Sequence, residues 1–268
     1  MKKFWLTAGL TLSLSATAFA AEPVAQEDFT EAETMVNGVV RDVAQKILPV
    51  SVEARYFAPH LDINVKSDKI YYNGGKVGLK DNLGIGNTGA PELLFRYKRF
   101  NLDYIRIHGT GDRNFGGNPL TFDGKKFYGD VHTKSNFDYL KLYMNNPIVS
   151  VLGQGVDWSY GLTGVQWKGT VSNASESSSK RYGAVIPTLG LGAHLSPTPS
   201  LRIYANVSGL PLGGYGHLVD FEAGVRYSPL EIVGIDIGYR KIRAKLKHHD
   251  DDGTFDLNGP FAGIRVDF

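Results

Sequence analysis

Apolar and polar residues alternate one by one over long stretches of this chain. The clearest example is the C-terminal segment Asp256 to Phe268. Its apolar face holds Pro260, Ala262, Ile264, Val266 and Phe268, and its other face holds Gly263, Arg265 and Asp267. A period of two predicts a β-strand. Because no later segment covers the apolar face, we expect lipid to cover it.

The same alternation predicts strands further upstream. Clean alternation covers residues 92–98, 185–195, 201–208, 217–228 and 233–240, and less regular strands are expected at 131–144 and 156–169. Trp158, Tyr160 and Trp167 are expected at the headgroup level, where aromatic rings gather. Two further segments change phase, 102–108 near Tyr104 and 52–65 near Tyr56. Either a β-bulge or a misplaced strand boundary explains both changes.

Connections between the predicted strands are alternately long and short. Polar, glycine-rich stretches follow every odd-numbered strand, at 67–90, 110–124, 171–180, 209–216 and 247–255. Short turns such as 196–200 and 228–232 follow the even-numbered ones. Long loops on one rim and short turns on the other are typical of transmembrane barrels. We predict an all-β, antiparallel, up-and-down transmembrane β-barrel of about ten strands, with eight or twelve as alternatives.

The N-terminal region has a different pattern. Met1-Lys2-Lys3, an apolar stretch and Ala18-Phe19-Ala20 predict a secretion signal over residues 1–20. A capping box at Thr30 and Glu33 then begins an apolar stripe of helical period that reaches Ile47. The expected organisation is a signal peptide (1–20), a periplasmic leader with an amphipathic helix (21–49) and the barrel (50–268). The helix is expected on the membrane surface, with a plug in the lumen or a poorly ordered leader as alternatives.

Composition agrees with an exported barrel. The chain has no cysteine, 32 glycines and a mean hydropathy of −0.18. That hydropathy is too low for a helical membrane protein and is expected for a barrel, where lipid-facing and lumen-facing residues alternate. The formal net charge of +2 excludes a dedicated nucleic-acid binder.

Several short motifs resemble those of a known group of proteins. They are 52–55 (VEAR), 81–85 (DNLGI), 91–92 (PE), 120–124 (LTFDG), 238–240 (GYR) and 259–263 (GPFAG). Together they resemble a group of uncharacterised bacterial outer-membrane β-barrel proteins over roughly residues 50 to 268. The resemblance implies the fold and a Gram-negative-type outer membrane, and it implies no activity.

The register predicts which charges face the lumen. They are Glu92, Arg96, Arg202, Asp220, Glu222, Arg226, Asp236, Arg240, Arg265 and Asp267. A barrel of this size has a narrow interior filled by side chains, and buried charges must be paired. We therefore predict a charge-paired structural network, with a narrow porin-like pore or a binding or catalytic site as alternatives.

Other candidate chemistry is weak. Residues 248–253 (HHDDDG) contain metal-binding side chains but lack the calcium-loop spacing, so we expect a solvated loop and no metal site. Ser159, Ser208 and Ser228 and the histidines His108, His132 and His217 show no local hydrolase motif. No catalytic residue and no cofactor are predicted.

The predicted function is an integral outer-membrane barrel with a structural or interaction role, or a narrow pore. The alternative is an outer-membrane enzyme that acts on lipid A, phospholipid or peptide, because enzymes of this class are also barrels. Expected partners are outer-membrane lipids and lipopolysaccharide, and the barrel-assembly machinery, which would bind the C-terminal strand ending in Phe268.

Overall fold

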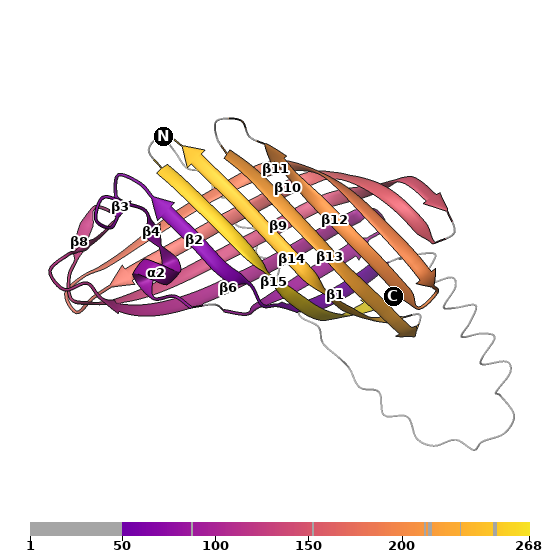
Figure 1. Ribbon diagram of the computed structural model, residues 1–268, viewed down its shortest axis with the longest axis horizontal. Helices are drawn as coiled ribbons and strands as arrows, with labels where there is room; N and C mark the ends of the chain where they lie inside the picture. Colours follow the sequence, from indigo (N-terminus) through magenta and orange to yellow (C-terminus); the bar gives the residue numbers. More distant parts are fainter. Residues whose placement is uncertain are drawn as a thin grey trace, which may run out of the picture. The chain divides into compact units, whose positions relative to one another are not determined.

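Ten antiparallel strands close into a barrel, as the alternation predicts (Figure 1). The computed structural model describes residues 50–268 except 87, 152, 212, 214, 215, 231, 249 and 250, with no side-chain description at 247, 248 and 251. Around the wall run β1 (Val50–Phe57), β5 (Ala90–Tyr97), β6 (Phe100–Asn114), β9 (Asp130–Val151), β10 (Gln154–Ser172), β11 (Ser177–Thr198), β12 (Leu201–Pro211), β13 (Gly216–Leu230), β14 (Val233–His248) and β15 (Asp251–Asp267). Pairing of β1 with β15 closes the ring. The predicted signal peptide and leader helix lie outside the described residues.

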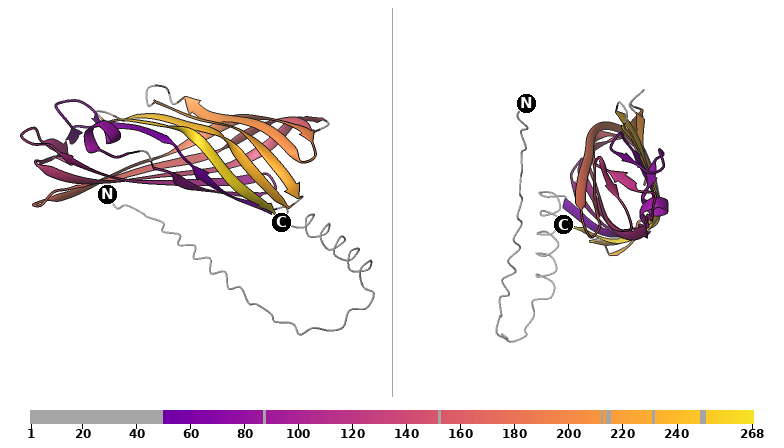
Figure 2. Two further views of the ribbon diagram at one scale, coloured as in Figure 1. Left: turned by 60° about the horizontal axis from the view of Figure 1, so that its bottom comes forward. Right: turned by 90° about the vertical axis from the view of Figure 1, so that its left-hand side faces the viewer.

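The two rims of the barrel differ, as predicted. Short turns join β5 to β6, β9 to β10, β11 to β12 and β13 to β14 at one end, which also holds Val50 and Phe268. We call this end the turn rim and the opposite end the loop rim. Near the loop rim lie β2 (His60–Lys66), β3 (Ile70–Tyr71), β4 (Val77–Gly78), α2 (Leu79–Leu83), β7 (Leu120–Phe122) and β8 (Lys125–Phe127) (Figures 1 and 2). No helix in the described part of the chain is long and apolar enough to cross a bilayer.

A belt of large apolar side chains covers the outside of the barrel on the turn-rim side. Leu93 on β5, Leu142 on β9 and Leu189 on β11 are 47%, 49% and 56% exposed, and Ile237 and Ile264 continue the belt on β14 and β15. Exposed leucine and isoleucine on every side of a barrel require an apolar solvent. The belt therefore marks the part of the wall that lies in the bilayer.

The two predicted phase changes are absent, and their cause is a change of surroundings. From Ser51 to Ser67 the odd-numbered residues stay buried without interruption. Inside, the chain changes from polar Glu53 and Arg55 to apolar Leu61 and Ile63, while the outside changes from Tyr56 to Asp62. The strand leaves the bilayer at this level, so water replaces lipid outside. The break at residues 58–59 separates β1 from β2 but keeps the register along β15.

β6 shows the same exchange without a bulge. Its pairing with β9 runs unbroken from Phe100 to Asn114. The lumen face changes from Asp103 to Ile105 and Ile107, and the outer face changes from Leu102 to Arg106. A bulge is therefore the wrong explanation for the altered pattern on this strand.

Above the belt, the barrel has a core like that of a soluble protein. The side chains of Phe57, Leu83, Leu120, Phe127 and Phe137 are at most 2% exposed there. Leu83 comes from α2, and Leu120 and Phe127 come from the β7–β8 hairpin, so side chains of the loop-rim connections contribute to this core. This packing closes the loop-rim half of the barrel with apolar side chains.

Two details of the sequence prediction are wrong. Trp167 does not face the headgroups: it is 2% exposed inside the barrel, donates a hydrogen bond from Nε1 to Ser135 Oγ (2.8 Å) and stacks on Tyr182. Trp158 and Tyr160 do face outward and stack on each other. Strands also extend further than predicted, since β6 reaches Asn114 and β15 begins at Asp251. A strand outside the membrane can have polar residues on both faces, so its sequence shows no alternation that would predict it.

Candidate functional site

The predicted lumen charges lie on the inner wall within the belt. Glu92, Asp220, Arg226, Asp236 and Arg240 are at most 8% exposed. The side chains of Glu222, Arg265, Arg96 and Asp267 are progressively more exposed, and Arg202 lines a cavity. Their contacts form a network, which we call the ionic cluster: Glu53, Arg55, Glu92, Asp103, Lys141, Asp220, Glu222, Arg226, Asp236 and Arg240.

Arg240 is the centre of the ionic cluster. Its side chain is 1% exposed and contacts carboxylates from three other strands. Nη2 lies 2.6 Å from Asp103 Oδ2 on β6 and 2.9 Å from Asp220 Oδ2 on β13, and Nη1 donates to Glu92 on β5. β14 and β6 lie on different sides of the ring, so this one guanidinium spans the lumen.

A second group of pairs lies beside Arg240. Arg55 donates to Glu53 and lies 3.0 Å from Glu222 Oε2. Arg226 Nε donates to Asp236 Oδ2 at 2.6 Å, and its Nη2 donates to Glu53 Oε2 at 3.2 Å. Buried ions are tolerated when they are paired and hydrogen-bonded. These pairs join β1, β13 and β14, and the ionic cluster as a whole has six acidic and four basic side chains.

Several members of the network were missed by sequence reasoning. Glu53, Arg55, Asp103 and Lys141 all lie on strands whose predicted alternation is irregular. Lys141 Nζ donates to Asp220 Oδ2 (3.0 Å) and Ser208 Oγ (2.6 Å). The signal was present, since each charge alternates with apolar neighbours over a short stretch. The change at the water boundary hid it.

A cavity of about 280 Å³ separates the ionic cluster from the turn rim. Among the described residues that line it are seven basic ones and a single acidic one, Asp157. The basic residues are Arg96, Lys98, Arg99, Lys141, Arg202, Arg226 and Arg265. Asp157 Oδ2 lies 3.5 Å from His194 Nδ1. The lumen is therefore strongly basic on the turn-rim side of the ionic cluster.

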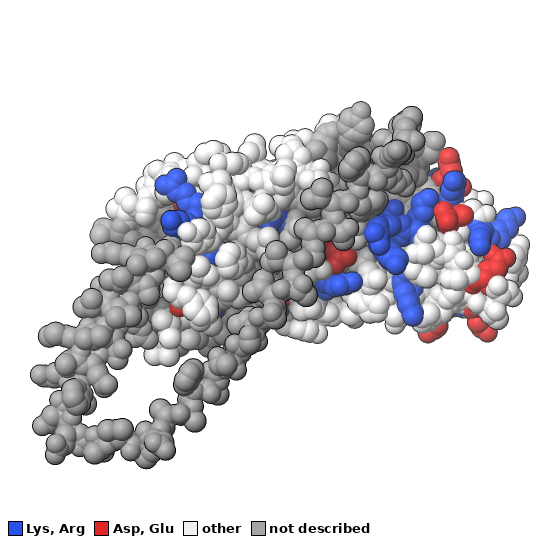
Figure 3. Space-filling view, turned by 180° about the vertical axis from the view of Figure 1, so that it is seen from behind, with Lys and Arg blue, Asp and Glu red and all other residues white. Residues whose placement is uncertain are grey.

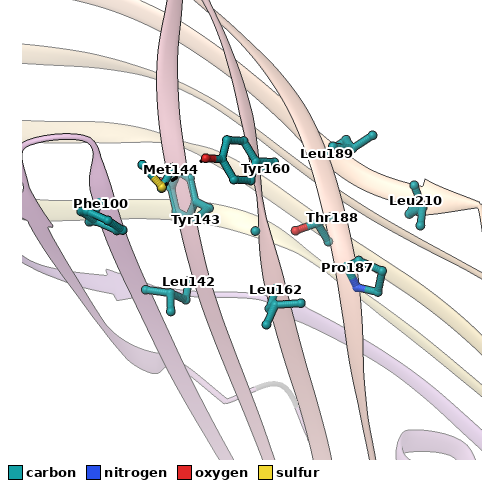
Figure 4. Close-up of a pocket in the computed structure, with 11 residues that line it drawn as sticks. Phe100, Leu142, Tyr143, Met144, Tyr160, Leu162, Pro187, Thr188, Leu189 and Leu210 are labelled. Carbon is teal, nitrogen blue, oxygen red and sulfur yellow. Dashed lines mark hydrogen bonds between the residues drawn. The ribbon is translucent and has the colours of Figure 1, made fainter.

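A larger depression, of about 580 Å³, lies on the outer wall of β9, β10 and β11 (Figure 4). Its lining is apolar, with Phe100, Leu142, Leu162, Pro187 and Leu189 among the residues drawn. These residues belong to the belt, and acyl chains fill such grooves in a membrane. We therefore assign this depression to lipid.

A polar groove of about 480 Å³ lies on the outer wall near the loop rim. Asp112, His132 and Ser172 stand side by side there on β6, β9 and β10, because each pairs with the next in register. His132 Nδ1 lies 2.7 Å from Asp112 Oδ1, and Ser172 Oγ donates to the His132 carbonyl at 3.4 Å. Sequence reasoning considered His132 but not Ser172, since only the barrel register joins them.

The histidine-aspartate segment lies partly outside the described residues. Positions 249 and 250 are among these, and the side chains of 248 and 251 are not described. No group of three His, Asp or Glu side chains suited to a metal ion occurs in the described part of the chain.

No family model and no curated protein sequence matches the chain. Solved structures do. The outer membrane protease OmpT from Escherichia coli has a TM-score of 0.48 at 9% identity, over 81% of this chain and 97% of that one. Neisserial surface protein A has a TM-score of 0.36 at 12% identity, over 82% of this chain and 97% of that one. OprG from Pseudomonas aeruginosa has a TM-score of 0.33 at 14% identity, over 82% of this chain and 96% of that one.

These neighbours are bacterial outer-membrane β-barrel proteins. At such low identity, their activities are not carried over to this chain. The closed wall, the apolar belt and the polar lumen independently require a bilayer. The chain is an integral transmembrane β-barrel protein.

Proposed function

We propose that this protein is a closed, non-conducting barrel that holds folded loops above the outer membrane surface, where they interact with other molecules. The observation that carries this proposal is the double closure of the lumen. Arg240 and its three carboxylate partners span the lumen within the belt, and an apolar core around Phe57 and Leu120 fills it above. A water-filled pore would need a continuous polar path through both layers.

Planar-bilayer recording of the refolded barrel tests this proposal against the narrow-pore alternative. We expect no discrete channel openings, because neither the ionic cluster nor the apolar core leaves a path. A porin refolded in the same detergent serves as the positive control for insertion. Regular single-channel steps from this chain would overturn the proposal.

Lipopolysaccharide is the proposed partner of the outer wall just above the belt. Lys168 on β10 and Arg181 on β11 are directly opposite each other, and Lys134 lies on β9, one strand away. None of the three has a carboxylate within ion-pair distance in the described part of the chain. Figure 3 shows Lys and Arg gathered on this side of the barrel beside an uncharged band. Phosphates at the outer-leaflet surface would relieve the repulsion between these cations.

The test of this partner is retention of lipopolysaccharide during purification. A Lys134→Gln/Lys168→Gln/Arg181→Gln variant is expected to retain several-fold less lipopolysaccharide than the wild type in the same detergent and salt. A matched triple variant at Lys76, Lys80 and Lys126, near the loop rim and away from this strip, controls for net charge. Equal loss in both variants would show that the strip is not the contact.

The aligned Asp112, His132 and Ser172 favour a second candidate function, hydrolysis of an ester or amide at the cell surface. A carboxylate that holds one imidazole nitrogen leaves the other nitrogen as a base for a neighbouring hydroxyl. Rotation of Ser172 about χ1 would turn Oγ from the His132 carbonyl toward the ring.

A fluorophosphonate probe, which labels activated serines, tests the second function. Labelling of the wild type that is lost in Ser172→Ala and His132→Ala, and kept in Ser179→Ala, would support it. Absence of labelling in the wild type would reject it and leave the closed-barrel proposal untouched.

A further inference from the structure

The cavity at the turn rim is lined by seven basic residues and one acidic residue of the described part of the chain. Lys141, Arg226 and Arg96 reach carboxylates of the ionic cluster, namely Asp220, Asp236 and Glu53. Arg265 is paired with Asp267, with Nη2 2.6 Å from Oδ1. The acidic partners lie deeper or toward the rim, so the space between them is lined by guanidinium and ammonium groups.

Arg202 is a basic residue of the cavity that is not paired with the ionic cluster. It projects from β12 into the cavity, and it makes no hydrogen bond or ion pair with any residue of the described part of the chain. In the pairing of β12 with β13 it stands directly opposite Arg226. Like charges opposite each other on one face of a sheet are destabilising. Arg226 is already paired with Asp236 and Glu53, whereas Arg202 has no such partner among the described residues, so a bound anion would compensate the charge of Arg202.

The surroundings favour an oxyanion as that missing partner. Arg96, Arg202, Arg226 and Arg265 come from four different strands, and all of them line one volume of about 280 Å³. Arginine forks bind phosphate oxygens in pairs. Neutral polar residues such as Ser159 and Asn206 also line the cavity, and their side chains are hydrogen-bond donors. The size suits a small ligand, since it is just below the range of about 300 to 1,000 Å³ found for drug-sized molecules.

Access to the cavity is from the turn rim. Lys98 and Arg99 form the β5–β6 turn and line the cavity entrance. In an outer-membrane barrel the rim with short turns faces the periplasm. Positive charge at a narrow mouth concentrates anions and speeds their entry. The opposite direction is blocked by the ionic cluster and the apolar core.

We propose that this cavity is a periplasm-facing binding site for a small phosphate-bearing anion, with Arg202 and Arg226 as its principal ligands. The site binds without transporting, because the lumen is closed beyond it. Arg202 is then explained as a residue kept for binding at some expense of stability. Removal of its charge should weaken binding and leave the empty barrel at least as stable.

Isothermal titration calorimetry of the full mature chain in detergent micelles tests this site, with inorganic phosphate as the probe and citrate at equal ionic strength as the carboxylate comparison. We expect saturable one-to-one binding of phosphate, weakened at least tenfold in Arg202→Gln. Lys126→Gln removes one exposed cation near the loop rim, away from both proposed phosphate contacts, and should bind like the wild type. Tighter binding of citrate than of phosphate would overturn the phosphate assignment.

Stability measurements separate a ligand from a structural residue. In urea unfolding, phosphate should stabilise the wild type and have no such effect on Arg202→Gln, since a ligand stabilises only the state that binds it. Without phosphate, the variant should unfold at the same or a higher urea concentration. Absence of saturable heat in the wild type, or destabilisation of the empty Arg202→Gln barrel, would overturn the proposal. Neither result bears on conductance, which tests the closed barrel separately.

Discussion

Arg240 shows how much a single buried ion can hold together. Its guanidinium contacts Glu92, Asp103 and Asp220 at almost complete burial. Removal of one member of a buried ionic network leaves its partners as uncompensated charges, which costs about 3–5 kcal/mol. This cost comes more from the unpaired charges that remain buried than from the contact that is lost. Truncation of Arg240 leaves three carboxylates facing one another in the lumen.

We therefore expect Arg240→Ala to lower the free energy of unfolding by about 3–5 kcal/mol. Urea unfolding of the barrel refolded into lipid vesicles, followed by tryptophan fluorescence, measures the change. Arg240→Lys keeps the charge but loses the guanidinium fork, so its free energy of unfolding should lie between those of Arg240→Ala and the wild type. Lys241→Ala, the adjacent residue on the outer wall, should stay within about 0.5 kcal/mol of the wild type. An Arg240→Ala barrel as stable as the wild type would show that the ionic cluster does not support the fold.

At the scale of the strand, the sequence predicted the barrel well where the strand is in lipid. Alternation identifies the outward residues of β13, β14 and β15, for example Phe221, Ile237 and Ile264, all of them exposed in the belt. Alternation failed to predict the facing of residues where one strand crosses from lipid into water, because the apolar residues lie on the outer face in lipid and on the inner face above it. Tyr104 followed by Ile105 looks like a shift of register and is a change of solvent.

The ionic cluster was predictable only in part, for a related reason. Period two identifies that Arg240 and Asp220 point inward. It does not identify that Arg240 meets Asp103, because these residues lie on strands on different sides of the ring. Such contacts depend on barrel size and stagger, which strand patterns do not specify.

The change of solvent along a strand makes a prediction on β9. Phe137 faces the apolar core above the belt, 1% exposed, with its ring centroid 5.5 Å from that of Phe255. Phe137→Ala should lower the free energy of unfolding by about 3–5 kcal/mol, as for a core phenylalanine in a soluble protein. Lys134→Ala, on the outer face of the same strand, should change it by less than about 0.5 kcal/mol. The same urea assay measures both, and a small effect at Phe137 would contradict a packed core in this half.

At the scale of the molecule, three layers follow one another along the barrel axis. The basic cavity lies at the turn rim, the ionic cluster lies deeper within the belt, and the apolar core lies toward the loop rim. The outer wall changes in step, from apolar around the first two layers to polar around the third. The arrangement gives the barrel a definite depth in the membrane, and we expect the short turns to face the periplasm.

Depth and direction can be measured by cysteine labelling, because the chain has no native cysteine to interfere. Lys126→Cys lies on the exposed β8 near the loop rim, and Lys98→Cys lies in the β5–β6 turn. A membrane-impermeant maleimide should label Lys126→Cys on intact cells and Lys98→Cys only after the outer membrane is permeabilised. Leu189→Cys lies in the belt and is 56% exposed in the isolated barrel. Lipid should protect it from the maleimide in both conditions, and detergent should protect it in the same way until the barrel unfolds. Labelling of Lys98→Cys on intact cells would show that the barrel has the opposite orientation. The basic cavity would then open to the outside of the cell, and its anion would have to come from there.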